Sequence, residues 1–188
     1  EAENATFPLA SGHRIGPQLP WYRGVKNQGM EIEARALSEF VEREMFPSDT
    51  SMSIDFHSGF GMKDRFWYPF AKSTKKFPNI REVNNLKSLF DQTFPHHIYT
   101  IEPQSHKYTT HGDLWDFLYE KKNDNPEHKN HLFIPWTLEM GSWVWIKKNP
   151  LQALSPLGLF HPIKGHRISR TMRRHLLLID FFFRAIRN

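Results

Sequence analysis

The sequence predicts an α/β domain of three layers, in which a mixed, mostly parallel sheet is flanked by helices. Two observations predict this class. Short runs rich in β-branched and aromatic residues alternate along the chain with longer segments that have the apolar spacing of amphipathic helices. A chain of 188 residues with 39% hydrophobic content is also long enough to bury one core. We therefore expect a single domain that spans residues 1–188.

The expected elements have recognisable start and stop signals. Three prolines and several glycines predict an irregular arm over residues 1–28. Met30–Phe46 has apolar residues at helical spacing, acidic residues in its first turn and Pro47 beyond its end. The elements that follow are a strand at Met52–Phe56, a basic loop at Lys72–Pro78, a helix at Asn79–Thr93 with Val83, Leu86, Leu89 and Phe90 inward, a strand at His97–Ile101, a short helix at Asp113–Lys121, a polar loop at Lys122–His131, a strand at Leu132–Met140, a Pro- and Gly-punctuated stretch over 142–166, and an amphipathic helix at Arg167–Arg187.

Composition limits the classes of function. The net charge is +5, but the basic residues are spread out except for four arginines near the C-terminus, at positions 167, 170, 173 and 174. We interpret these as the solvated face of a helix and expect no nucleic-acid partner, because no recognised binding motif accompanies them. The longest apolar stretch, Leu176 to Phe183, contains Asp180 and is too short to span a bilayer, so no membrane partner is expected. The oligomeric state is not predicted.

The chain contains no cysteine. Disulfide bonds and thiolate ligands are therefore excluded, and any metal must be held by nitrogen and oxygen donors. A disulfide-free chain favours the cytosol without excluding secretion.

Two motifs carry the chemistry. Ser53-Ile-Asp-Phe-His57-Ser-Gly-Phe-Gly61 and Ile134-Pro-Trp-Thr-Leu-Glu139-Met-Gly141 are short β-favouring runs, and each delivers one reactive side chain just before a glycine-containing turn. The carboxyl ends of strands line the ligand crevice of an open α/β sheet. If the two strands are neighbours, an imidazole and a carboxylate meet there, which suits metal-assisted hydrolysis.

These motifs resemble those of the zinc carboxypeptidases of the pancreatic type and their bacterial relatives. Asp55-Phe-His57-Ser58 is similar to the strand end that carries the family's third zinc ligand, and Thr137-Leu-Glu139-Met-Gly141 to the strand that carries its catalytic glutamate. Tyr108 stands eight residues before the pair Asp116-Phe117, which is the spacing of the family's mobile tyrosine. Phe66-Trp-Tyr-Pro-Phe70 looks like the family's aromatic-Pro-aromatic run.

The resemblance implies specific roles. His57 would be one ligand of a single zinc ion, and Glu139 the general acid and base that takes a proton from the metal-bound water. Tyr108 would contact the substrate from a loop that closes over it. Trp115 would lie in the pocket for the terminal residue and make it shallow. Asp55, on the same side of its strand as His57, could orient hydrogen bonds in the cleft or serve the structure alone.

One part of the family pattern is absent. The family also binds zinc through an upstream His-x-x-Glu pair, and none of the 11 histidines here has glutamate three residues later. Because the sequence begins with Glu1, we expect it to be the C-terminal portion of a catalytic domain whose remaining zinc ligands lie upstream.

Three functions are compatible with these observations. The leading interpretation is a zinc-dependent metallocarboxypeptidase, which is a hydrolase that cleaves C-terminal amide bonds of peptides. The second is a related amidohydrolase that acts on acyl-amino acids. The third is a non-catalytic binding module that has lost its metal ligands.

Overall fold

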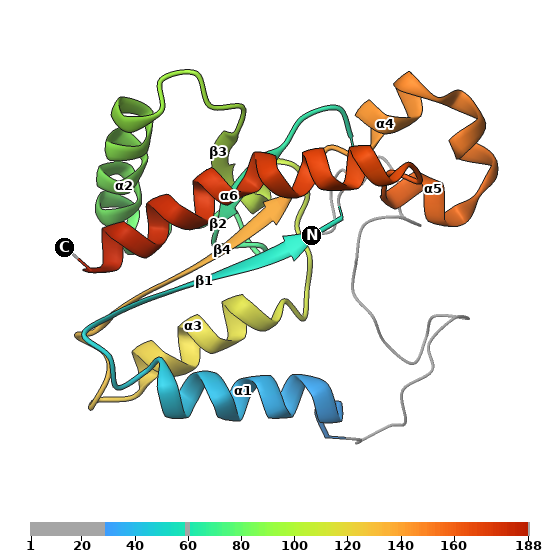
Figure 1. Ribbon diagram of the computed structural model, residues 1–188. Coiled ribbons are helices and arrows are strands. Elements are labelled where there is room, and N and C mark those ends of the chain that lie inside the picture. Colours follow the sequence, from blue (N-terminus) through green and yellow to red (C-terminus); the bar gives the residue numbers. More distant parts are fainter. Residues whose placement is uncertain (1–28, 59–60, 188) are drawn as a thin grey trace. The chain divides into compact units, whose positions relative to one another are not determined.

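The computed structural model describes residues 29–58 and 61–187 (Figure 1). The arm expected over residues 1–28 lies outside them. The elements are, in chain order, α1 (Ile32–Glu44), β1 (Thr50–His57), β2 (Arg65–Tyr68), α2 (Ile80–Thr93), β3 (Thr100–Pro103), the short helix η1 (Gln104–His106), α3 (Leu114–Asp124), β4 (Leu132–Glu139), α4 (Trp143–Lys148), the short helix η2 (Pro150–Leu154), α5 (Pro156–Phe160) and α6 (Gly165–Arg187).

The strands of the described residues form one mixed, mostly parallel sheet in the order β1-β4-β2-β3. β1 and β4 are neighbours, and their arrowheads point to the same end of the sheet (Figure 1). β2 runs antiparallel to β4, with Arg65 opposite Glu139 and Trp67 opposite Thr137. The α/β class expected from the sequence is confirmed.

The chain passes several times between two compact units. The first contains the described residues up to Ser53 together with Tyr68–Ile80 and Pro103–Pro135, and the second contains Ile54–Trp67, Arg81–Glu102 and Trp136 to the C-terminal end.

The first unit contains α1 and α3, which contact each other. Its core is aromatic: the Tyr119 ring lies 4.7 Å from the Phe77 ring, and the Phe46 ring lies 6.0 Å from the Phe133 ring. α3 begins after Asp113, whose carboxylate accepts a 2.8 Å hydrogen bond from the Asp116 amide. This contact is an N-cap, which satisfies a donor that a helix leaves unpaired in its first turn.

The second unit contains α2 and α6, whose apolar side chains pack on one face of the sheet. Phe66 of β2 stacks on Trp136 of β4 with ring centres 4.5 Å apart, and Phe182 of α6 packs edge-on against Phe66 at 5.3 Å. Phe90 of α2 meets Phe181 of α6 at 4.8 Å. Even-numbered residues of β2 and β4 thus bury this face, so the odd-numbered residues Arg65, Thr137 and Glu139 point to the other face.

Several local expectations need correction. β2 was not expected as a strand, and β3 begins at Thr100 rather than at His97. The stretch 142–166 contains the short helices α4, η2 and α5. Leu89, expected inward, is exposed on α2. Lys122, expected in a solvated loop, is buried in the last turns of α3.

Buried Lys122 has a structural role that the sequence did not suggest. Its ammonium donates to the carbonyl oxygen of His131, and a second carbonyl oxygen, that of Lys129, lies 3.4 Å away. Burial lowers the pKa of Lys122. The side chain therefore ties the end of α3 to the loop that leads into β4.

Candidate active site

His57 and Glu139 are the last residues of the neighbouring strands β1 and β4. The His57 Nδ1 atom lies 3.2 Å from Glu139 Oε2. The Met140 amide also donates a 3.2 Å hydrogen bond to the His57 carbonyl, which fixes the two strand ends side by side. The sequence placed an imidazole and a carboxylate at one crevice, and the structure brings these two side chains into contact.

The His57 ring is held from both sides by carboxylates. Its second nitrogen, Nε2, lies 3.2 Å from Asp55 Oδ2, two residues earlier on β1. Hydrogen bonds with Asp55 and then Glu139, against the opposing effect of burial, raise the pKa of His57 to about 10. The ring is therefore an imidazolium at neutral pH and donates an N–H to each carboxylate. Glu139 is largely buried, whereas His57 and Asp55 are partly exposed.

Two more charged residues extend this group across the sheet. Arg65 of β2 stands directly opposite Glu139, so the two side chains share a face of the sheet. The Arg65 guanidinium donates a 2.6 Å hydrogen bond to Glu102 of β3. From β1 to β3 the charges of His57, Glu139, Arg65 and Glu102 alternate in sign, and we call these four residues with Asp55 the charged row.

Sequence reasoning missed Arg65 and Glu102. The available signal was the alternation of Arg65-Phe-Trp-Tyr68, in which a charge and a buried Phe66 occupy opposite faces of a short strand. The run of aromatic residues around it concealed that alternation.

The turn after Glu139 depends on a close approach of two backbones. A Cβ atom at Gly141 would lie 2.9 Å from the backbone nitrogen and carbonyl carbon of Lys63. The Gly141 amide also donates a 2.8 Å hydrogen bond to Oδ1 of the buried Asp64. Position 141 therefore requires glycine, because only a residue without a side chain lets this turn pass so close to the Lys63 backbone.

Asp64 also links this turn to the helix behind the sheet. Its Oδ2 atom lies 3.1 Å from Nη2 of Arg174 on α6, and its carbonyl oxygen accepts a hydrogen bond from the Thr100 amide. Beside this pair, Tyr99 Oη and His175 Nδ1 are 2.9 Å apart. Burial raises the pKa of Tyr99 and lowers that of His175. This polar cluster holds the backbone around Glu139 in place.

Tyr108 and Trp115 belong to the first compact unit, whereas the charged row belongs to the second. Tyr108 is half-buried and follows η1 in an irregular stretch. Trp115 lies in the first turn of α3, with its ring centre 6.5 Å from that of Phe133. Their roles as substrate contacts stay predictions.

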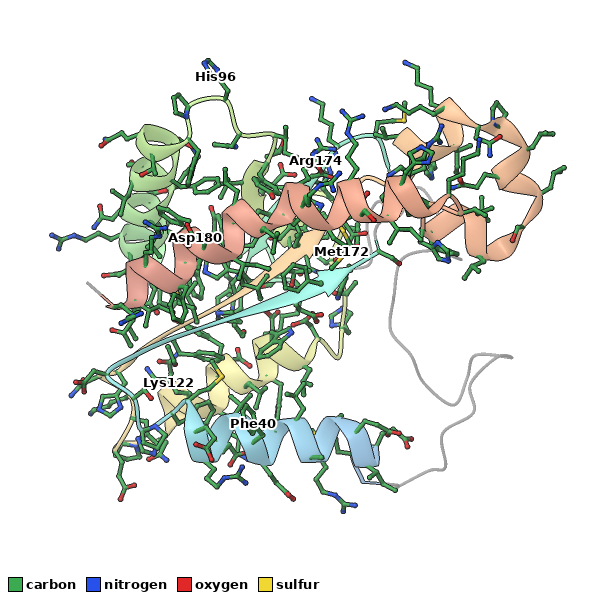
Figure 2. All side chains as sticks on the ribbon, in the orientation of Figure 1. Phe40, His96, Lys122, Met172, Arg174 and Asp180 are labelled. Atoms are coloured by element: carbon green, nitrogen blue, oxygen red, sulfur yellow. The ribbon has the colours of Figure 1, made fainter. Side chains whose placement is uncertain are left out.

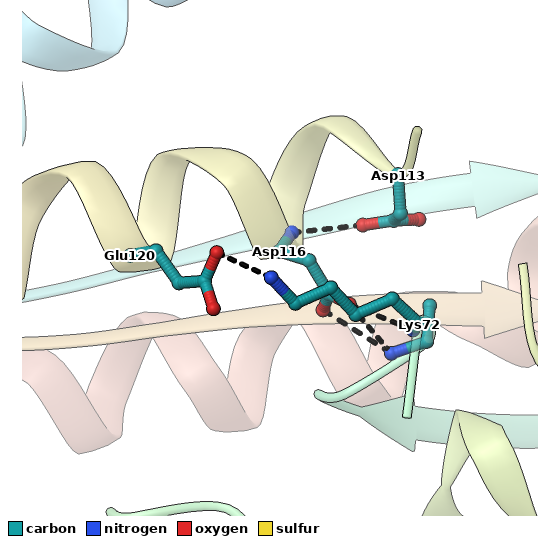
Figure 3. Close-up of polar contacts among 5 residues, drawn as sticks. Lys72, Asp113, Asp116 and Glu120 are labelled. Carbon is teal, nitrogen blue, oxygen red and sulfur yellow. Dashed lines mark hydrogen bonds and ion pairs between the residues drawn. The ribbon is translucent and has the colours of Figure 1, made fainter. Parts of the chain in front are cut away.

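The Asp116 carboxylate connects two segments that the sequence singled out separately. It accepts hydrogen bonds from the backbone amides of Ala71, at 2.9 Å, and Lys72, at 2.8 Å, just after the aromatic run that ends at Phe70. Figure 3 shows this contact together with the ion pair between Lys72 and Glu120. Burial raises the pKa of Asp116 to about 6, although the two amide donors oppose the shift.

Within residues 29–58 and 61–187, no three His, Cys, Asp or Glu side chains form a group that could hold a metal ion. His57 is the one imidazole of the charged row. The charged row thus offers one imidazole nitrogen beside carboxylates, which is fewer than the three protein ligands that a catalytic zinc ion takes.

Comparisons with models of known protein families, with curated proteins and with solved structures find no match. The charged row itself is therefore the basis for a functional assignment.

Proposed function

We propose that this chain carries part of the active site of a zinc-dependent hydrolase similar to the metallocarboxypeptidases, which cleaves C-terminal amide bonds of peptides. One observation carries the proposal: His57 and Glu139 end neighbouring strands and lie 3.2 Å apart. A metal ligand and a general base must lie within several ångströms of each other if the base is to reach water bound to that metal. The proposal includes the three-layer, carboxypeptidase-like architecture expected from the sequence.

In this proposal His57 holds zinc through one ring nitrogen. Zinc supplies a bound water whose pKa is lowered to about 7. A ligating imidazole is neutral, so His57 must lose a proton, and a carboxylate must withdraw from the nitrogen that binds the metal. Asp55 and Glu139 now face one nitrogen each. The carboxylate that remains fixes the orientation and tautomer of the ring.

Glu139 is the group that moves a proton. Its carboxylate is mostly buried at the end of β4 and is aimed at the His57 ring, so it can accept a proton beside that ring and return it to the leaving amine. Tyr108 and Trp115 are proposed as contacts of the substrate. The further zinc ligands are proposed to lie upstream in the intact protein, where the family has its His-x-x-Glu pair.

The test measures zinc content and hydrolysis together. The chain, alone and extended by any upstream sequence of its gene, is supplied with zinc and assayed on an N-acyl dipeptide and on an N-acyl amino acid. Glu139→Gln should retain zinc and lose about 10²–10⁴-fold in turnover, as expected for a general acid and base. His57→Ala should lose zinc. Glu127→Gln changes an exposed carboxylate outside the charged row and is the matched control.

The outcomes separate the three functions. Zinc-dependent cleavage of the dipeptide supports the peptidase, and cleavage of the acyl-amino acid alone supports the amidohydrolase. Zinc-loaded protein that cleaves neither, or Glu139→Gln protein with normal turnover, contradicts the hydrolase. Absence of zinc from both forms of the chain would support the non-catalytic binding module.

A further inference from the structure

Charge is unevenly distributed along this chain. From Met140 to Asn188 there are nine Lys and Arg residues, six of them in α6, and one acidic residue, Asp180. The net charge of the whole chain is only +5, so the rest of the chain is net negative. Such asymmetry is typical of proteins that contact an anionic surface.

The same segment exposes a long apolar stripe on α6. The buried side of this helix carries His175, Leu178, Phe181 and Phe182. Beside it, six large apolar side chains with helical spacing are exposed by 42–64%: Ile168, Met172, Leu176, Ile179, Phe183 and Ile186. We call these six residues the α6 stripe. The apolar side of α6 is therefore wider than the surface that the sheet covers.

Short helices just before α6 add to this exposed apolar surface. Leu151 and Leu154 of η2 and Leu157 of α5 are exposed by 74%, 83% and 62%. η2 contacts both α4 and α5, so these leucines project from one small helical cluster of the second unit. Isolated exposed leucines are common, but three that are more than half exposed within one short helical cluster are typical of an interaction surface.

Cations lie beside the α6 stripe. The guanidinium of Arg187 is 5.3 Å from the centre of the Phe183 ring, so charge and apolar surface meet there. Arg174 is not one of these cations, because Figure 2 shows it on the opposite side of α6 from Met172 and it pairs with the buried Asp64. No helix within the described residues has the length and hydropathy to cross a bilayer.

We propose that the α6 stripe, with the leucines of η2 and α5, binds an anionic lipid surface as a peripheral contact. Apolar side chains of Leu, Ile, Met and Phe enter the boundary between head groups and acyl chains, and exposed arginines that flank the stripe, such as Arg187, lie at the phosphates. The stripe is mostly aliphatic, which disfavours single-stranded nucleic acid, since that is bound on aromatic rings. The proposal differs from the sequence-based expectation of no membrane partner, which considered only whether an apolar stretch could span a bilayer.

The test is co-sedimentation of the full chain with vesicles of phosphatidylcholine, with and without phosphatidylserine. We expect binding to the phosphatidylserine vesicles that weakens as salt rises. Leu154→Ser and Leu176→Ser should each lower the partition coefficient about tenfold, since each removes an apolar side chain that the lipid surface would bury. Replacing Arg173 with Gln should lower it about fivefold on anionic vesicles only. Ile32→Ser removes an equally exposed residue of α1 and should change nothing.

Circular dichroism of each variant confirms that the fold is retained, as expected at exposed positions. The proposal is overturned if phosphatidylserine vesicles do not sediment the chain, or if both leucine variants bind like the unchanged chain. Self-association that Leu176→Ser abolishes, without vesicle binding, would assign the α6 stripe to a second copy instead. Glu139→Gln should bind vesicles normally, so this result is independent of the proposed hydrolase.

Discussion

The imidazole of His57 lies 3.2 Å from the carboxylate of Glu139, although 82 residues separate them in the sequence. Asp55 lies at the same distance from the other ring nitrogen. Two carboxylates therefore share one imidazolium at the end of the sheet.

The first prediction concerns the protonation of His57. Without added metal, its ring should titrate with a pKa of about 10, because both carboxylates stabilise the charged form. Asp55→Asn and Glu139→Gln should each lower this pKa towards the ordinary value of about 6.5. NMR titration of the ring protons measures it. A His57 pKa below 7 in the unchanged chain would contradict the two contacts.

The raised pKa of His57 also makes the stability of the folded chain depend on pH. The folded-state pKa of His57 is raised above its unfolded value, so the stabilisation is fully present below about pH 6.5 and is lost as the pH rises through about 10. Asp55→Asn should reduce this alkaline loss, because only the contact with Glu139 then remains. The measurement is the midpoint of urea unfolding at several alkaline pH values, for the unchanged chain and for Asp55→Asn.

The second prediction concerns Asp116. Because burial raises its pKa to about 6, the folded state holds a proton that the unfolded state releases at about pH 4. The free energy of unfolding should therefore fall by about 3 kcal/mol between pH 4 and 7 relative to Asp116→Asn. Asp113→Asn keeps a good N-cap and should keep most of this dependence. If the free energy of unfolding changes with pH in the same way for the unchanged chain and for Asp116→Asn, Asp116 is not buried as described.

The third prediction concerns Gly141. Gly141→Ala places a methyl group against the Lys63 backbone, which cannot move aside like a flexible side chain. We expect a loss of about 1–3 kcal/mol in the free energy of unfolding, the usual cost of overpacking. Gly165→Ala, where a Cβ meets no atom within 4 Å, should be neutral or slightly stabilising. Equal stability of the two variants, measured by urea unfolding, would rule out the close approach.

The fourth prediction compares two neighbouring lysines. Lys122 is buried and donates to the His131 carbonyl, so Lys122→Ala should cost about 2–4 kcal/mol through lost packing and an unsatisfied acceptor. Lys121 is exposed and its ammonium lies 2.5 Å from Glu42, a surface pair, so Lys121→Ala should cost less than about 1 kcal/mol. Thermal unfolding of both variants provides the measurement. The reverse order would contradict the burial of Lys122.

The sequence alone determined the local features of this protein. The apolar alternation of β1 and β4 and the glycines after them placed His57 and Glu139 at strand ends, and helical spacing located α1, α2, α3 and α6. These signals depend on residues close together in the chain, which is why they can be recognised without knowledge of the fold.

Only the tertiary structure decided which distant residues meet. It paired Arg65 with Glu139 across β2 and β4, clamped His57 between two carboxylates, buried Lys122 and left the α6 stripe exposed. Strand register, ion pairing and burial depend on contacts between segments far apart in sequence. The sequence alone therefore does not distinguish a side chain that the folded chain covers from one that it leaves in solvent.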